Sequence, residues 1–189
     1  MPRQAAHIRE ATPDDADELL MLWAATHEGD ASSIRETQDA KRALANLAAH
    51  PDERLLVVEC EKHIVAAMQL SRGPVSPLSL DSVVHTSFLV VAPDQRRHGY
   101  AHALMEAAVS WAEEKDIAQI TTFTDGNRDT NRFFARLGLT TLATVRSAPT
   151  SVLLKKLAAD RGRATGKGNR HLVEVLAQRR SMRRRQNEG

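Results

Sequence analysis

The sequence predicts an α+β fold: a mixed, mainly antiparallel central sheet flanked by helices, with a basic helical extension at the carboxyl end. The 189 residues, 42% apolar and 26% charged, match one globular domain plus an appendage and argue against a disordered, fibrous or membrane-embedded chain. Helical and strand-like segments also follow one another in mixed order. Such an order is typical of a largely antiparallel sheet with one parallel pair.

The first half of the chain predicts two helices and three strands. Proline and two carboxylates at residues 13–15 suit the first turn of a helix, and a second helical run stops before Pro51. The two residues Glu61 and Lys62 have the length of a tight hairpin connection. The expected elements are a strand at 8–12, helices before and after the polar break at 27–30, and strands at 55–60 and 63–70.

The second half predicts one long helix between two strands, which makes those strands parallel neighbours. Gly73, Pro74 and Pro77 mark a loop at 73–77, and Gly138 ends a short helix. The expected elements are a strand at 82–91, a helix at 99–115, a strand at 120–124, a helix at 129–137, and two further strands around 139–145 and 151–157.

The net charge of +2 combines two unlike regions. From residue 158 onward, nine Lys and Arg against three Asp and Glu give +6, so residues 1–157, with 17 against 21, carry −4. No apolar run reaches membrane-spanning length and no signal-like stretch follows the amino terminus, so we expect a soluble, cytoplasmic protein. Cys60, the single cysteine, excludes an intramolecular disulfide and fits a buried strand position.

The strongest chemical signal lies at residues 90–104, where a strand ends, a basic loop turns at Gly99, and a long helix begins. This arrangement directs unpaired backbone N–H groups and a positive helix end toward one point, as pyrophosphate binding requires. The helix dipole supplies only about 0.3–1 kcal/mol, so hydrogen bonds and the charges of Arg96 and Arg97 would provide most of the affinity. The alternative is a glycine that only starts a helix, beside solvated arginines.

These residues also resemble a known family. Residues 96–101, Arg-Arg-His-Gly-Tyr-Ala, are similar to the Arg/Gln-x-x-Gly-x-Gly/Ala pyrophosphate motif of the GNAT superfamily of N-acetyltransferases, and the strand exit Val-Ala-Pro at 91–93 precedes them. Asn127 with Phe-Phe-Ala-Arg-Leu-Gly-Leu at 133–139 resembles the family's second motif. The resemblance covers about residues 7–157 and implies the GNAT fold.

The resemblance implies an acetyl-CoA or other acyl-CoA donor, as substrate, between two splayed parallel strands. An acceptor amine would attack the thioester directly, without an acyl-enzyme, and no metal is required. The acceptor cavity would be walled by residues 27–33 and 72–81. The donor contacts implied by the resemblance are Leu89, Val90, Val91, Arg96, Arg97, His98, Gly99, Tyr100, Ala101, His102, Asn127 and Phe134.

His85 is the candidate catalytic base, because it lies where several family members carry a catalytic carboxylate, counting back from Val91. An imidazole, with an ordinary pKa of about 6.5, accepts protons at neutral pH. The alternative is a hydrogen-bonded sheet residue. Phe134 stands where many relatives use a tyrosine hydroxyl to protonate the departing thiolate. A catalytically inactive acyl-CoA-binding regulatory protein is therefore the second hypothesis.

The predicted organisation is an acyltransferase domain at 1–157, a glycine-containing linker at 158–168, and a basic amphipathic helical tail at 169–189. The tail suits docking on its own or a neighbouring subunit in a homodimer, weak contact with nucleic acid or another anionic surface, or a disordered end. His98 and His102 have zinc-chelating spacing but no evident third ligand, so we predict no metal site.

Overall fold

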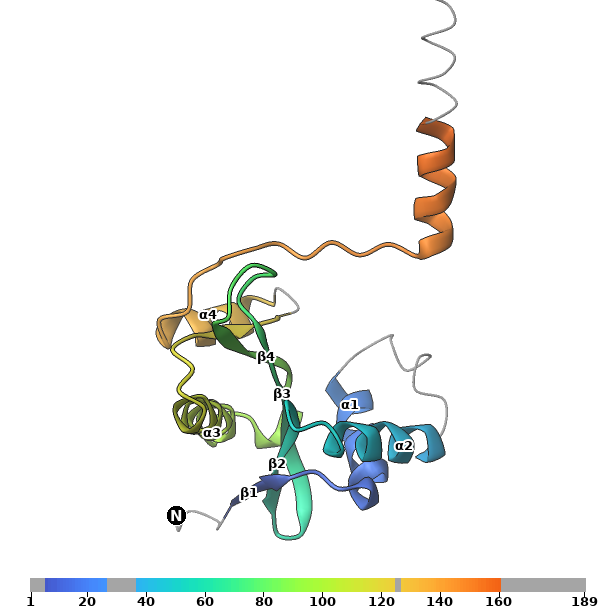
Figure 1. The fold of residues 1–189 in the computed structure, drawn as a ribbon. Helices are drawn as coiled ribbons and strands as arrows, with labels where there is room; N and C mark the ends of the chain where they lie inside the picture. The colour runs from blue at the N-terminus through green and yellow to red at the C-terminus, as the bar shows by residue number, and fades with distance from the viewer. Residues whose placement is uncertain (1–5, 27–36, 125–126, 161–189) are drawn as a thin grey trace, which may run out of the picture. The chain divides into compact units, whose positions relative to one another are not determined.

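A five-stranded mixed sheet forms the centre of the structure. The computed structural model describes residues 6–26, 37–124 and 127–160 (Figure 1). The strand order follows the sequence, and neighbouring strands are antiparallel except for the last two, which are parallel. The strands are β1 (His7–Glu10), β2 (Glu53–Cys60), β3 (His63–Pro74), β4 (Ser82–Val91) and β5 (Ile120–Thr122). The predicted α+β class is confirmed.

Four helices cover the two faces of this sheet. Helices α1 (Ala16–Thr26) and α2 (Thr37–Ala48) lie on one side, and α3 (Tyr100–Glu114) lies on the other (Figure 1). Helix α4 (Arg128–Arg136) packs its apolar residues into the same cluster as α3. A short 3-10 turn, η1 (Pro13–Asp15), precedes α1. A second one, η2 (Pro93–Gln95), lies between β4 and α3. None of the helices in the described ranges is long and apolar enough to cross a membrane.

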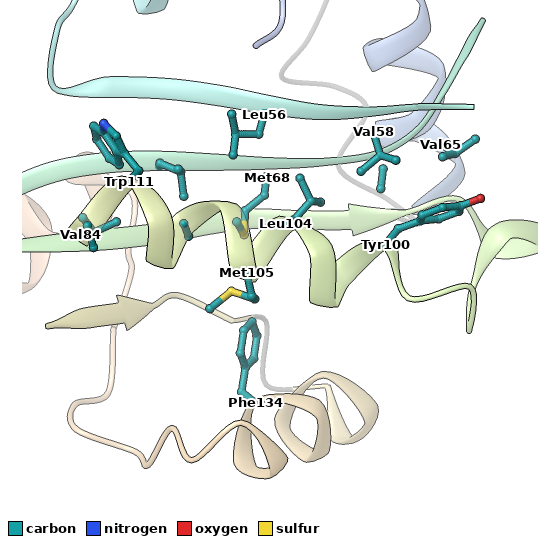
Figure 2. Packing of buried hydrophobic residues seen from close by; sticks show 14 of the residues in the cluster. Leu56, Val58, Val65, Met68, Val84, Tyr100, Leu104, Met105, Trp111 and Phe134 are labelled. Atoms are coloured by element: carbon teal, nitrogen blue, oxygen red, sulfur yellow. The ribbon is translucent and has the colours of Figure 1, made fainter. Parts of the chain in front are cut away.

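Alternating side chains divide the core between the two faces. Val58, Met68 and Val84 point toward α3, where they pack with Leu104 and Trp111 (Figure 2). Their strand neighbours turn the other way, so the α1 side of the sheet has its own cluster of Leu22, Val57, Ile64, Ala67 and Val90. A residue's parity along a strand therefore decides which helices it meets.

The predicted tight hairpin between β2 and β3 is confirmed. Glu61 and Lys62 both have positive φ angles, 51° and 67°, as the central residues of a type I′ turn do. This turn is preferred because its twist matches that of the two strands, even where neither position is glycine.

The prediction of two strands around 139–145 and 151–157 is wrong. Residues 139–149 carry no regular secondary structure, and residues 150–160 are helical. Val152 N–H and Leu153 N–H both bond to the Pro149 carbonyl, at 3.0 and 3.1 Å. Leu, Lys and Ala dominate residues 153–159 and favour helix, so local propensity prevails where no strand pairs with the segment.

One strand limit also differs from expectation. Strand β3 runs to Pro74, past the predicted end at 70, because residues 71–74 continue to pair with β4. The chain divides into two units, Met1–Thr140 and Thr141–Gly189, and the predicted domain boundary at 157/158 falls within the helical residues 150–160. The predicted basic tail at 169–189 lies outside the described residues.

Arg9 connects the first strand to the turn that starts α1. Its guanidinium donates to both carboxylate oxygens of Asp15, at 2.7 and 2.8 Å, and to Glu59 on β2 at 2.9 Å. Asp15 also accepts from the Thr12 backbone N–H. The hydrogen bonds from Arg9, chief among these causes, lower the pKa of the Asp15 carboxyl to about 2.

Replacing Asp15 by Asn should lower the free energy of unfolding by about 1–2 kcal/mol at pH 7, because the Arg9 guanidinium loses one of its two carboxylate partners and keeps only Glu59. The pKa of Asp15 is lowered on folding, so this stabilisation is present above about pH 4 and is lost as the pH falls toward 2. Urea unfolding between pH 2.5 and 7 measures the difference. Asp14→Asn, at an exposed position in the same turn, is the control. An equal effect of both changes at all pH values would contradict the prediction.

Candidate functional site

Strands β4 and β5 pair only over three residues and then part. The register pairs are Val84↔Ile120, His85↔Thr121 and Thr86↔Thr122, and the last hydrogen bond joins Phe123 N–H to the Thr86 carbonyl at 2.9 Å. Beyond this point, β4 pairs with β3 alone among the described strands. One backbone edge of residues 89–91 is thus left without a strand partner and can hydrogen-bond to an extended ligand.

A β-bulge lies at the point where the strands part. Phe88 and Leu89 together lie opposite Met68, because Gln69 pairs with Ser87 and Ala67 with Val90. Phe88 has a φ of 53°, an uncommon and strained conformation for a bulky residue, and its ring contacts Trp23 of α1 with centroids 5.1 Å apart. The bulge bends β4 away from the direction of its parallel neighbour.

The free edge of β4 leads through a short basic loop to the start of α3. Gly99 is the N-cap, with a φ of 91°, and no side chain caps this helix end. A Cβ at Gly99 would meet nothing within 4 Å, so glycine is needed for the backbone conformation rather than for space. The first N–H groups of α3 therefore point outward beside the exposed Arg96 and Arg97.

His98 and Tyr100 make contacts that hold this loop in place. His98 Nδ1 lies 3.0 and 3.1 Å from the carbonyl oxygens of Gln95 and Arg96. The His98 ring stacks on the Tyr100 ring, with centroids 5.8 Å apart. Tyr100 is buried, and burial together with a hydrogen bond to Cys60 raises the pKa of its hydroxyl. Cys60 is buried, as the sequence predicted.

Asn127 and Phe134, both predicted donor contacts, have local roles on α4. Asn127 caps the helix, its side-chain oxygen accepting from the Asp129 N–H at 2.9 Å. Phe134 is only 4% exposed and points into the core beside Met105 of α3 (Figure 2). The structure thus places Phe134 in the packing between α3 and α4.

His85 lies on the opposite face of the sheet from α3. Its neighbour Val84 belongs to the α3 cluster, so the imidazole projects on the side of α1. Its Nδ1 lies 2.6 Å from the Thr121 hydroxyl oxygen, and its ring contacts the Phe123 ring, with centroids 5.7 Å apart. Sequence reasoning did not find Thr121 and Phe123, because only the register of the parallel pair brings them to His85.

The remaining predicted positions are separate from this cluster or outside the described residues. His102 and Ala101 lie in the first turn of α3, where His102 Nε2 is 3.4 Å from Glu106. The described ranges contain no group of three His, Cys, Asp or Glu side chains placed to hold a metal ion. Residues 27–33, one predicted wall of the acceptor cavity, are outside the described residues.

Comparisons with known proteins show the family and the fold of the chain. A family model, the acetyltransferase (GNAT) family, matches residues 17–139, well over half of the chain. The chain belongs to the GNAT acetyltransferase family. Acyl transfer is the chemistry of this family, with acetyl-CoA as the usual donor. A comparison with curated proteins gives no match.

Solved structures share the GNAT fold at low sequence identity. A transcriptional regulator from Bacillus halodurans C-125 has a TM-score of 0.68 and 20% identity, covering 77% of this chain and 99% of its own. Glucosamine-6-phosphate N-acetyltransferase from Arabidopsis thaliana has a TM-score of 0.65, 14% identity and the same coverage. The aminoglycoside N-acetyltransferase AAC(6')-Iy in complex with CoA has a TM-score of 0.64 and 16% identity. The match covers 79% of this chain and 98% of that one.

Replacing Phe134 by Tyr tests its place in the core of this GNAT protein. A hydroxyl added to the buried ring would lack a partner, so the free energy of unfolding should fall by about 1–3 kcal/mol. Phe133→Tyr on the same helix, at a less buried position, is the control and should cost less. Urea denaturation measures both. An unchanged stability with Phe134→Tyr would place residue 134 in a polar, accessible site instead.

Proposed function

We propose that this protein is an N-acetyltransferase that transfers an acetyl group from acetyl-CoA to an amine by direct attack. The observation that carries the proposal is that an unpaired strand edge leads directly to an uncapped helix end. The unpaired edge of β4 at residues 89–91 runs into the uncapped amino terminus of α3 at Gly99. An extended amide-containing arm that ends in a pyrophosphate matches these two features in order.

The donor would bind through backbone groups. The amide-containing arm of the donor would pair with Leu89, Val90 and Val91 as a further strand does. The pyrophosphate would accept hydrogen bonds from the amides of residues 97–102, with Arg96 and Arg97 adding charge. The Phe88 bulge turns the backbone of β4 at the point where the donor's thioester would reach it. A backbone N–H there can polarise the thioester carbonyl.

His85 would act as the general base. It would take a proton from the acceptor ammonium, and the free amine would attack the thioester carbon. The new C–N bond forms as the C–S bond breaks, and the released thiolate takes a proton from solvent or from the amine nitrogen. Positioning of the two reactants and proton transfer are the contributions expected of the protein.

A second candidate function is acyl-CoA binding without turnover. The observation that favours it is Phe134, which is buried and offers no hydroxyl from α4 to the departing thiolate. In this case the protein would bind the same donor and act as a regulatory protein through another surface. Binding and turnover experiments separate the two functions.

Replacing Gly99 by Glu should abolish CoA binding, because a carboxylate would face the pyrophosphate at the helix end. Gly138→Glu is a matched control. Both glycines have a positive φ, 91° and 87°, and a Cβ at either meets nothing within 4 Å, so the two changes carry similar strain. Isothermal titration calorimetry with CoA measures the affinity. Unchanged binding by the Gly99 variant, with the fold intact, would refute this donor site.

Replacing His85 by Ala should lower kcat/KM for the amine by about 10²–10⁴-fold while leaving CoA affinity unchanged, because only proton removal is lost. Thiol release from acetyl-CoA with a panel of amines measures the rate, and His63→Ala, at an exposed end of β3, is the control. A full rate for His85→Ala across the pH range would exclude His85 as the base. CoA binding by the wild type without turnover of any amine would favour the regulatory function.

A further inference from the structure

Three neighbouring strands place a small set of residues around the His85 imidazole. His85 on β4 lies beside Thr121 on β5, and Gly73 on β3 lies two residues from Ser71, the register partner of His85. Register partners and residues two positions along a strand share a face. His85, Thr121 and Gly73 therefore share the side of the sheet that faces α1.

Thr121 fixes one nitrogen of the ring. Its hydroxyl oxygen is 2.6 Å from His85 Nδ1, a short hydrogen bond between two side chains. Backbone bonds hold this pair on both sides. Val84 N–H donates to the Gln119 carbonyl at 3.1 Å, and Phe123 N–H donates to the Thr86 carbonyl at 2.9 Å. The pair therefore lies inside the paired part of the β4–β5 ladder, just before the strands part.

Gly73 places no side chain against the other nitrogen of the ring, Nε2. A Cβ added to Gly73 would lie 3.5 Å from His85 Nε2 and 3.7 Å from Cδ2, which is van der Waals contact. The φ of Gly73 lies outside the positive range, so its backbone conformation does not require glycine. Among the residues that the structure describes, Nε2 has no hydrogen-bond partner.

We propose that Thr121 is a positioning residue for His85, and that Gly73 keeps the approach to Nε2 open for the acceptor amine. Nδ1–H donates to the Thr121 oxygen, and the lone pair on Nε2 takes the ammonium proton. The acceptor then reaches the imidazole from the side of β3. This inference rests on the proposed function, and it adds the reacting nitrogen and the direction of approach.

The tautomer of His85 provides a test that needs no substrate. We would record ¹⁵N NMR spectra of histidine-labelled full-length protein, with His85→Gln identifying the signals. The wild type and Thr121→Ser should carry the neutral proton on Nδ1, and Thr121→Val should lose this preference because its side chain cannot accept. Thr122→Val, the same kind of change on the opposite face, is the control. A wild-type proton on Nε2, or an unchanged tautomer in Thr121→Val, would overturn the role of Thr121.

Kinetics test the same role during turnover. Thr121→Val should lower kcat by about 10–100-fold, the size of loss seen when the hydrogen-bond partner of a metal-bound histidine is removed, with an unchanged KM for acetyl-CoA. Thr121→Ser should restore most of the rate. In a His85→Ala background, Thr121→Val should have no further effect, because it acts through the imidazole. Independent, additive losses would indicate a structural role and refute the proposal.

Gly73→Ala separates access from orientation. It should raise the KM of the amine and slow modification of His85 by diethyl pyrocarbonate, which reacts with an unprotonated imidazole nitrogen, while the tautomer stays that of the wild type. The fold should be kept, since Ala fits the same backbone conformation. Unchanged modification would overturn the role of Gly73. If no amine is acetylated, the failure falls on the proposed function, and the NMR and modification results still decide the roles of Thr121 and Gly73.

Discussion

The limited pairing between β4 and β5 is the constraint on which the rest of the site depends. Three register pairs hold the strands together, and then the bulge at Phe88 redirects β4. Before the divergence, side chains of the two strands meet and can form a polar pair. After it, the backbone of β4 is free on one edge. A single break in the ladder thus separates the proposed side-chain site from the proposed main-chain site along one strand.

The two faces of the sheet have different roles. On the α3 face, a continuous apolar cluster binds the strands to the long helix and fixes where that helix begins (Figure 2). On the α1 face, apolar packing by Leu22, Val57 and Val90 gives way to the polar pair of His85 and Thr121 toward β5. Because neighbouring residues of β4 alternate between these faces, the same ten residues serve both the core and the proposed chemistry.

Much of the fold could be predicted because its signals are local. The hairpin at Glu61 and Lys62, the helix that follows Gly99, and the parallel pair around that helix all follow from turn chemistry and apolar spacing. The neighbours of His85 could not be predicted, because the register of a parallel pair depends on how the intervening helix packs. The strands expected around 139–145 and 151–157 failed for a related reason, since a strand needs a partner and a helix does not.

Tyr100, the first residue of α3, affects how firmly the amino-terminal end of this helix is held. Its buried hydroxyl forms a hydrogen bond with Cys60 at the end of β2, so the first turn of α3 is tied to the sheet as well as to its own helix. The N–H groups of that turn are therefore held in direction before any anion arrives. An anion that binds there does not have to order the backbone first, so less of the gross interaction energy is lost as conformational entropy.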